Sequence, residues 1–546
     1  MFSHVRNLGR LIRAAWVLSR YDALFAIDAG EPPAPVKAAR AIARVRQKIG
    51  GANKLADGAQ ASEGDRLAAA LTELGPSYIK LGQFLATRPD VVDPALARDL
   101  AKLQDRLPPF DTDTAQAIIV EEFGEPWSAL YGEMSDAIAA ASIAQVHKAT
   151  TVEADGTTRD VAVKVLRPGI EQRFAADLET FFWVARLIDR AVPSSRRLKP
   201  IDVVQTLADS MALEMDLRLE AAAMSEMAER TKGDAGFRTP AIDWERTSKR
   251  VMTLEWIPGI PIADRARISA ANLDPKAVAA NLITTFLTHA VREGYFHADM
   301  HPGNLFVEAD GSPGGTLVAV DYGIMGRLNA KESRFLAEIL FGFVIRDYRR
   351  VAEVHFEAGY VPENKSVDGF AQALRAIGEP ILGREAHEIS MARLLAQLFE
   401  VTGQFEMETR PELIMLQKTM VVVEGVARDL DPDFNMWKTA EPVLRQWLES
   451  RIGPEGRLQD AVKGAERMGR LMGDLPDLLE TAERAARSLA GPRGFGGGGG
   501  VADGLKLHPD TAKAIANAQA ERERPNRIAL WVGAVALAVI AVAVVI

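Results

Sequence analysis

Three oxygen-bearing side chains near the middle of the sequence could together handle a phosphorylated ligand. Residues 297–304 read HADMHPGN, so Asp299 precedes Asn304 by five positions, and Asp321 follows in an Asp-Tyr-Gly triplet at 321–323. Phosphoryl transfer requires a carboxylate near the attacking group and hard oxygen ligands for Mg2+. We predict the first role for Asp299 and metal-ligand roles for Asn304 and Asp321. The first motif alone fits a surface loop with scattered acids equally well, and the second Asp favours a site.

Lys164 lies inside an apolar run, VAVKV at 161–165, that is typical of a buried strand. An unpaired ammonium is costly to bury, so we expect an anionic partner for Lys164. The turn dipeptide Asp155-Gly156 separates this run from the preceding one and predicts a hairpin.

The segment that enters this hairpin is rich in small residues but contains no glycine. As a phosphate-binding loop it would be stiffer than a glycine loop and would contact phosphates differently. An alanine run by itself is more often an ordinary packed helix. We nevertheless take the segment as the candidate nucleotide-binding loop, which comprises Ile138, Ala139, Ala140, Ala141, Ser142, Ile143, Ala144, Gln145 and Val146.

Residues 201–230 have helical spacing and carry two candidate partners for Lys164, Glu214 and Glu220. Six residues correspond to about 240° of helix rotation, so the two carboxylates cannot both reach one lysine from a single helix. Two acidic faces indicate two basic partners. The second candidate is Lys80, which shares a helical face with Gln83, although an amphipathic surface helix would give the same pattern.

The connection between two lobes of a nucleotide-binding fold should follow a strand and leave backbone groups exposed for the adenine. The run VMTLEWIPGI at 251–260 has this form, because Pro258-Gly259 stops the strand. We expect the adenine to meet the backbone of Glu255 and Ile257. A core strand that ends in a turn would look the same.

Seven ordered motifs between about Leu71 and Leu328 resemble those of UbiB, an atypical protein-kinase-like family linked to ubiquinone (coenzyme Q) biosynthesis. They are KLGQ (80–83), LQDRLPP (103–109), AAASIAQVH (139–147), VAVK (161–164), EMD (214–216), HADMHPGN (297–304) and DYG (321–323).

The resemblance implies an α+β, two-lobed protein-kinase-like fold with ATP and Mg2+ as its ligands. It implies that the alanine-rich loop replaces a glycine-rich one, and that Asp299 is the proton acceptor. It further implies that Lys164 contacts phosphates and pairs with Glu220. Lys80 would then reach into the nucleotide site and pair with Glu214, as further catalytic residues.

Two departures from ordinary kinases bear on the substrate. Tyr322 replaces the usual Phe, and Ala298 replaces the arginine that pairs with a phosphorylated activation loop. The residues after Tyr322 turn quickly to helical spacing and show no Ala-Pro-Glu segment. These features disfavour ordinary protein phosphorylation. They fit what the resemblance implies, an ATPase-like activity tied to lipid-soluble quinone intermediates. A nucleotide-dependent, non-catalytic scaffold for lipid precursors or for other ubiquinone-biosynthesis enzymes is the alternative.

Composition excludes several classes of site. The formal net charge of −9 disfavours nucleic acid as a partner, because phosphate-binding surfaces need clustered Lys and Arg. The chain has no cysteine, which rules out disulfides, thiolate zinc sites and cysteine-ligated iron clusters. A zinc pair at His297 and His301 is disfavoured, because Pro302 biases His301 away from helix.

The C-terminus predicts a membrane anchor. Residues 528–546 contain no charge, and their helical length of roughly 28 Å matches the hydrocarbon thickness. Arginines at 522, 524 and 527 predict an inner-membrane location with the large domain in the cytoplasm. At the N-terminus, residues 2–16 predict an amphipathic helix that lies on lipid or on the protein's own core. Six apolar residues can share one face of it, opposite Arg6, Arg10 and Arg13: Phe2, Val5, Leu8, Leu11, Ile12 and Trp16.

We therefore predict a membrane-anchored chain that binds ATP and contacts membrane lipids and quinone precursors. Its organisation would be an N-terminal helical extension (1–70), an atypical kinase-like core (71–330, with the N-lobe to about 256), a helical C-lobe and extension (331–490), a linker and juxtamembrane segment (491–527) and a C-terminal transmembrane helix (528–546).

Overall fold

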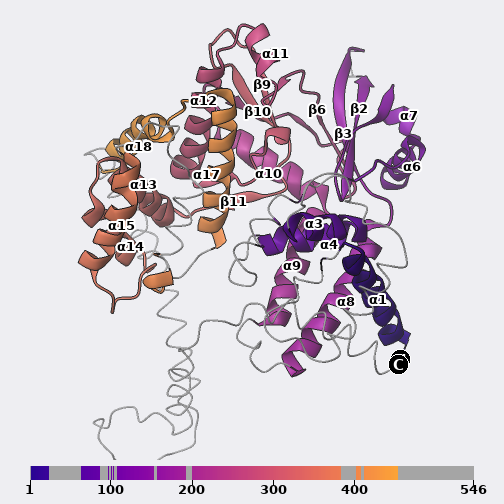
Figure 1. Cartoon of the computed structure of the whole chain (residues 1–546). Coiled ribbons are helices and arrows are strands. Elements are labelled where there is room, and N and C mark those ends of the chain that lie inside the picture. The colour runs from indigo at the N-terminus through magenta and orange to yellow at the C-terminus, as the bar shows by residue number, and fades with distance from the viewer. Residues whose placement is uncertain are drawn as a thin grey trace, which may run out of the picture. The chain divides into compact units, whose positions relative to one another are not determined.

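The computed structural model describes residues 2–21, 23, 63–86, 96, 100, 103, 107–152, 156–191, 199–382, 401, 403–407 and 411–452. Within them, Figure 1 shows the long strands β2, β3 and β6 beside the short helices α6 and α7, and the helices α1, α3, α4, α8 and α9 grouped together.

The sheet that carries Lys164 is five-stranded, in the order β1-β2-β3-β6-β5, and all its neighbouring strands are antiparallel. Its strands are β1 (Met134–Ala140), β2 (Ala144–Val152), β3 (Thr158–Leu166), β5 (Ile242–Asp243) and β6 (Val251–Glu255). The hairpin of β2 and β3 was predicted correctly, and Gly156 in its turn has a φ of 83°, a region that favours glycine.

One face of this sheet is covered by α6 (Thr112–Phe123) and α7 (Trp127–Leu130). Ile118 and Ile119 of α6 form a buried core with Val163 and Val165 of β3. Because successive side chains of a strand alternate between its faces, Lys164 points to the opposite face. There its ammonium meets α10 (Leu217–Arg230).

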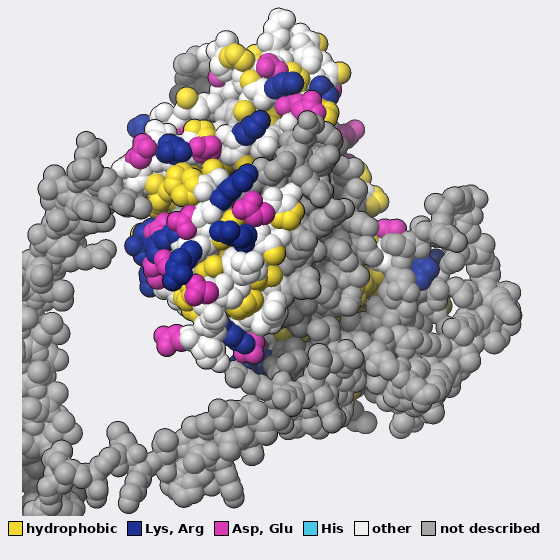
Figure 2. All heavy atoms as spheres, turned by 60° about the vertical axis from the view of Figure 1, so that its left-hand side comes forward, with side chains coloured by type: hydrophobic (Ala, Val, Ile, Leu, Met, Phe, Trp, Pro, Cys, Tyr) yellow, Lys and Arg dark blue, Asp and Glu magenta, His cyan; other side chains and the backbone are white. Residues whose placement is uncertain are grey.

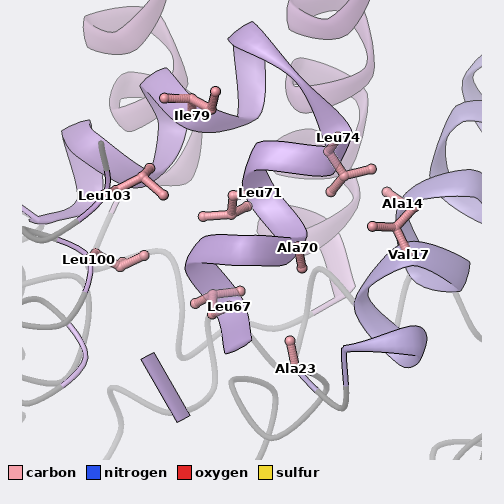
Figure 3. Close-up of a cluster of buried hydrophobic side chains, with 10 residues drawn as sticks. All are labelled: Ala14, Val17, Ala23, Leu67, Ala70, Leu71, Leu74, Ile79, Leu100 and Leu103. Atoms are coloured by element: carbon pink, nitrogen blue, oxygen red, sulfur yellow. The ribbon is translucent and has the colours of Figure 1, made fainter. Parts of the chain in front are cut away.

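Figure 3 shows the core of the N-terminal helices, where α1 (Phe2–Arg20), α3 (Glu63–Leu74) and α4 (Pro76–Ala86) meet. Leu67, Leu71 and Leu74 lie on one face of α3 at the helical spacing of three and four. Two further helices, α8 (Ile170–Ala191) and α9 (Pro200–Glu214), pack against each other, and both contact α4.

The apolar face predicted for α1 is split in the structure. Leu11 is buried against Val184 and Ile188 of α8, so the helix lies on the protein's own core. Ile12 and Trp16 are 48% and 51% exposed, and they point away from that core. Leu11 therefore lies on the buried side of α1, whereas Ile12 and Trp16 of the same predicted face are half exposed.

The prediction of one continuous helix over 201–230 is wrong. The chain leaves α9 at Met215, and Asp216 has the extended backbone of an N-cap, whose carboxylate accepts a hydrogen bond from the Arg218 backbone N–H at 3.1 Å. Glu214 therefore ends one helix and Glu220 lies in the first turn of the next.

The part of the chain from residue 237 onward adds two small sheets. One has the order β4-β10-β9-β7 and the other pairs β11 with β8. Their strands are β4 (Phe237–Arg238), β7 (Ile260–Pro261), β8 (Tyr295–His297), β9 (Leu305–Glu308), β10 (Thr316–Ala319) and β11 (Met325–Arg327).

The helices of this part of the chain, with their bounds, complete the described residues. They are α11 (Arg265–Ala270), α12 (Pro275–Thr288), the π-helix η3 (His289–Glu293), the 3-10 helix η4 (Pro302–Asn304), α13 (Ala330–Val344), α14 (Tyr348–Glu357), α15 (Val367–Leu382), α17 (Pro411–Leu430) and α18 (Met436–Ile452). In Figure 1, α17 runs beside α12, and the two helices are in contact.

The face shown in Figure 2 carries acidic and basic side chains side by side, with apolar side chains between them. Ion pairs of α14 show the same mixing of charges: Arg350 contacts Glu338 and Glu357, and Arg349 contacts Asp368. Neither sign of charge dominates around these pairs.

The predicted linker and transmembrane helix, at 491–527 and 528–546, lie outside the described residues. Among the helices that are described, none combines the length and the apolar character needed to cross a bilayer. The predicted domain boundaries remain predictions.

Candidate functional site

Lys164 of β3 has the anionic partner that its burial requires. Its ammonium lies 2.7 and 2.8 Å from the two carboxylate oxygens of Glu220 and 3.4 Å from Asp321. The side chains of Lys164 and Glu220 are 13% and 8% exposed. Burial alone would lower the pKa of Lys164, but the carboxylates of Asp321 and Glu220 outweigh it and raise this pKa. Lys164 is therefore a charged ammonium between two carboxylates.

Asp321 directly follows the β9-β10 hairpin. One of its oxygens accepts a hydrogen bond from the Gly323 N–H at 3.0 Å, and its side chain is 44% exposed. Burial raises the pKa of Asp321, but Lys164, the Gly323 N–H, His297 and Lys80 together bring it down to about 2. Asp321 is thus ionised at neutral pH and partly open to a ligand.

Asn304 lies at the same end of that hairpin as Asp321. Asn304 precedes β9, whose Leu305 pairs with Ala319 of β10, and the Val320 N–H donates to the Asn304 carbonyl at 3.0 Å. This antiparallel register brings the two predicted metal ligands together across the strand ends. An amide oxygen and an ionised carboxylate form a donor set that suits Mg2+.

Asp299 lies in the loop between β8 and η4. Its backbone N–H donates to Nδ1 of His297 at 3.1 Å, and its carbonyl accepts from the Asn304 side-chain amide at 3.2 Å. Burial lowers the pKa of His297, and the charges of Asp321 and then Asp299 oppose this shift. Both carboxylates therefore act on one buried ring. His301, in contrast, caps η4 by accepting from the Gly303 N–H.

Lys80 and Glu214 form the second ion pair, with 2.5 Å between their charged atoms and side chains 12% and 14% exposed. The pair joins α4 to the C-terminal end of α9. Because Lys80 also lowers the pKa of Asp321, its ammonium acts on the same group of charges as Lys164.

Gly82 lets α4 approach its neighbours. A Cβ atom at this position would lie 2.7 Å from a methyl carbon of Leu71 and 2.9 Å from one of Leu103, closer than real Cβ contacts. The glycine is therefore a packing requirement of the helix that carries Lys80.

The alanine-rich segment is a strand, a tight turn and a strand, so the helical alternative is wrong. The turn is closed by a hydrogen bond of 2.8 Å from the Ala141 N–H to the Ala144 carbonyl. Arg167 fixes it from outside, because its guanidinium donates twice to the Ala141 carbonyl, at 2.9 and 2.8 Å. Val146 pairs directly with Lys164 in the hairpin register.

Only part of this segment is open to a ligand. Ile138 and Ala139 are exposed, and Ala140, Ala141 and Val146 are half-buried, whereas the side chains of Ser142, Ile143, Ala144 and Gln145 are buried. Gln145 is also fully engaged, since it exchanges hydrogen bonds with the backbone of Phe110 at 2.9 and 3.1 Å and contacts the His147 ring. We therefore no longer expect the Gln145 side chain to contact a nucleotide.

Of the three backbone amides at Glu255, Trp256 and Ile257, two donate hydrogen bonds within the described residues and one does not. The Glu255 N–H donates to the Ala241 carbonyl and the Trp256 N–H to the Asp160 carbonyl. Among the described residues, no hydrogen bond engages the Ile257 amide. Ile257 therefore remains a candidate to meet an adenine, whereas Glu255 can offer only its carbonyl.

Sequence reasoning missed Arg238, which holds this connection. Its guanidinium donates to both oxygens of Glu255 at 2.9 Å and to both oxygens of Glu308 at 2.8 Å. It thereby joins the end of β6 to β9, just after Asn304. No local pattern announces this contact, because the three residues lie far apart in sequence.

The chain is similar to known proteins over most of its length. Residues 102–355 match the ABC1 atypical kinase-like domain, and residues 374–435 match the UbiB helical domain. A probable protein kinase UbiB from Marinobacter nauticus is 38% identical over 487 residues, which cover 89% of this chain and 87% of that protein.

Two further relatives carry the same description. The Vibrio cholerae protein is 39% identical over 78% of both chains, and the Xanthomonas campestris protein is 39% identical over 76% of this chain and 75% of its own. A solved complex of a Mycobacterium tuberculosis protein with erythromycin shares 22% identity and a TM-score of 0.46, over 76% of this chain and 98% of that one.

Proposed function

Because the chain belongs to the UbiB family of atypical kinase-like proteins, we propose that it binds ATP with Mg2+ and turns over the nucleotide in support of ubiquinone biosynthesis. The observation that carries this proposal is the ammonium of Lys164, held between Glu220 and Asp321. A charged lysine beside an ionised, partly exposed carboxylate is the arrangement that a metal-bound phosphate needs.

Asn304 and Asp321 would hold the metal, which when bound offsets phosphate charge. Lys164 binds and orients the phosphates from the sheet, and Glu220 keeps its ammonium in place. Asp299 accepts the proton of the attacking group, and the loop of Ile138 to Ala141 covers the nucleotide.

The ion pair of Lys80 and Glu214 favours ATP hydrolysis over transfer to a peptide. A helix that brings a lysine to the phosphates takes space that an approaching peptide would need. Ala298 also disfavours transfer to a peptide, because it cannot pair with a phosphorylated activation loop as an arginine would.

The test is ATP turnover by the full-length chain in lipid vesicles, with Asp299→Asn as the variant. Removing a proton acceptor typically costs 10²- to 10⁴-fold, so we expect turnover to fall about 100-fold or more while nucleotide affinity stays within about threefold. The matched control is Asp310→Asn, an exposed acid in the β9-β10 loop, which should retain full turnover.

Equal turnover of the wild type and Asp299→Asn would refute the catalytic role. If Asp299→Asn instead abolishes turnover but the chain is a nucleotide-dependent scaffold for quinone precursors or for other ubiquinone-biosynthesis enzymes, quinone biosynthesis should not depend on that turnover. Quinone content in cells that carry the variant separates these outcomes, since a scaffold would maintain it.

We further propose that residues 528–546 anchor the chain in the cytoplasmic membrane, with the large domain in the cytoplasm. The support is the uncharged C-terminal sequence behind three arginines. Cell fractionation of a chain truncated at residue 527 tests it, and continued recovery in the membrane fraction would contradict a single C-terminal anchor.

A further inference from the structure

A threonine of α17 reaches the loop that carries Asp299. The Thr419 hydroxyl lies 2.8 Å from the carbonyl oxygen of Ala298, a residue 121 positions away, and 2.9 Å from the Met415 carbonyl of its own helix. Thr419 and Ala298 are 1% and 4% exposed. The contact to Met415 is the ordinary one for a helical threonine, whereas the contact to Ala298 is a specific tertiary one.

The Ala298 carbonyl belongs to the peptide unit that leads into Asp299. The opposite end of this unit is the Asp299 N–H, which donates to Nδ1 of His297 at 3.1 Å. Thr419 therefore fixes one end of the peptide plane and His297 the other. A plane held at both ends sets the backbone orientation of Asp299, and hence the direction in which its carboxylate leaves the chain.

The rest of the loop is tied to the Asp-Tyr-Gly segment and to Asn304. The Ala298 N–H donates to the Ile324 carbonyl at 3.0 Å, and the Asn304 side chain donates to the Asp299 carbonyl at 3.2 Å. Of these contacts, only that of Thr419 comes from the helical segment that follows the kinase-like domain.

The hydroxyl can be removed without removing the helix. Leu416, Met420 and Val423 of α17 are buried apolar residues, and α17 packs against α12. This apolar packing should keep α17 in place on α12 without the Thr419 hydroxyl, because the hydrophobic contribution to their association does not depend on one hydrogen bond. Thr419→Val keeps the branched shape and deletes only the donor.

We infer that Thr419 is a positioning residue for Asp299, through which the helical segment holds the catalytic loop in its working conformation. The inference rests on the proposed function, because it requires Asp299 to be the proton acceptor. In regulated kinases an arginine and a phosphorylated residue hold this loop. Here the neutral hydroxyl of Thr419 would do so.

The experiment compares Thr419→Val, Thr419→Ala and Thr419→Ser in the full-length chain in vesicles. We expect kcat for ATP to fall about 10- to 100-fold in the Val and Ala variants, because a displaced catalytic group costs factors of this size. Nucleotide affinity should change less than threefold. Thr419→Ser should recover most of the turnover. Thr231→Val is the matched control and should keep wild-type kcat. Thr231 follows α10, and within the described residues its buried hydroxyl bonds the Met227 carbonyl of that helix and no other group.

Amide hydrogen exchange measures the order of the Asp299 loop independently of ATP turnover. Peptides that cover residues 296–304 should exchange faster in Thr419→Val than in the wild type, while peptides from α12 should not. A folded Thr419→Val variant with wild-type kcat would overturn the inference. A loss of turnover in Thr419→Ala but not in Thr419→Val would also overturn it, because the side chain would then act through its packing and not through its hydroxyl. Asp299→Asn separates the two hypotheses: if its turnover is normal, the proposed function fails, whatever the Thr419 variants do.

Discussion

Lys164 and Glu220 form a two-pronged ion pair between β3 and α10, with the ammonium 2.7 and 2.8 Å from the two carboxylate oxygens. Both side chains are nearly buried. We predict that Glu220→Gln lowers the free energy of unfolding by about 3 kcal/mol, because breaking a buried pair leaves a charge without its neutralising partner. Urea denaturation measures this change.

The matched change is Arg218→Gln, two residues earlier in α10, whose solvent-exposed pair with Asp216 should contribute far less to stability. A loss in Glu220→Gln no larger than in this control would show that Asp321 alone suffices to compensate Lys164.

Gly82 should not tolerate a methyl group. Alanine at this position would press on Leu71 and Leu103, which are buried in the core of Figure 3, so we predict a loss of about 1–3 kcal/mol. The shift of α4 should also weaken the pair of Lys80 with Glu214.

Thermal unfolding tests this prediction, with Gly9→Ala as the control. A Cβ at Gly9 in α1 would meet nothing within 4 Å, so alanine there should be neutral or stabilise by up to about 1 kcal/mol. Similar effects of the two substitutions would refute the close-packing role of Gly82.

His355 predicts a loss of stability in mild acid. This α14 residue is buried, its Nδ1–H donates to the Val351 carbonyl at 2.7 Å, and burial lowers its pKa to about 4. The unfolded value is about 6.5, so the folded chain binds fewer protons between the two. The stability that neutral His355 contributes is present above about pH 6.5 and is lost as the pH falls through about 4, in total roughly 3 kcal/mol.

The measurement is urea unfolding of the wild type and of His355→Gln between pH 4.5 and 7.5. Glutamine cannot titrate, so the wild type should lose more stability than the variant as the pH falls. Parallel curves would show that His355 is not the group responsible.

Tyr322 predicts a substitution that does no harm. Its hydroxyl is buried and has no hydrogen-bond partner among the described residues. Its ring packs on that of His297, with 5.1 Å between the ring centroids. Tyr322→Phe keeps the ring and removes a group that is costly to bury, so we expect stability to stay unchanged or to rise by about 1 kcal/mol. Differential scanning calorimetry decides the point, and a clear drop in Tm would indicate a partner for the hydroxyl.

The sequence predicted correctly those features that depend on the chemistry of one residue and its near neighbours in the chain. A lysine inside an apolar strand demands a carboxylate, and the two glutamates and two lysines did sort into two ion pairs. The β2-β3 hairpin followed from its turn dipeptide. The break between α9 and α10 was not predicted from the helical spacing of 201–230, although Asp216, an N-cap residue type, lies at that break.

Other parts of the site depend on contacts that no local pattern encodes. Arg238 meets Glu308 across 70 positions and Thr419 meets Ala298 across 121, so neither could be placed before the fold was known. The alanine-rich segment misled in a different way. Its composition did not reveal that Gln145 turns inward to the backbone of Phe110.

The corner at Met215 and Asp216 has a mechanical consequence. Glu214 and Glu220 stand on either side of it, each gripping a lysine from a different part of the chain. A displacement of Lys80 would therefore act on Glu220, the carboxylate that pairs with Lys164, through the short connection between α9 and α10. We therefore expect a change that displaces α4 to alter the position of Glu220 and, with it, that of the Lys164 ammonium.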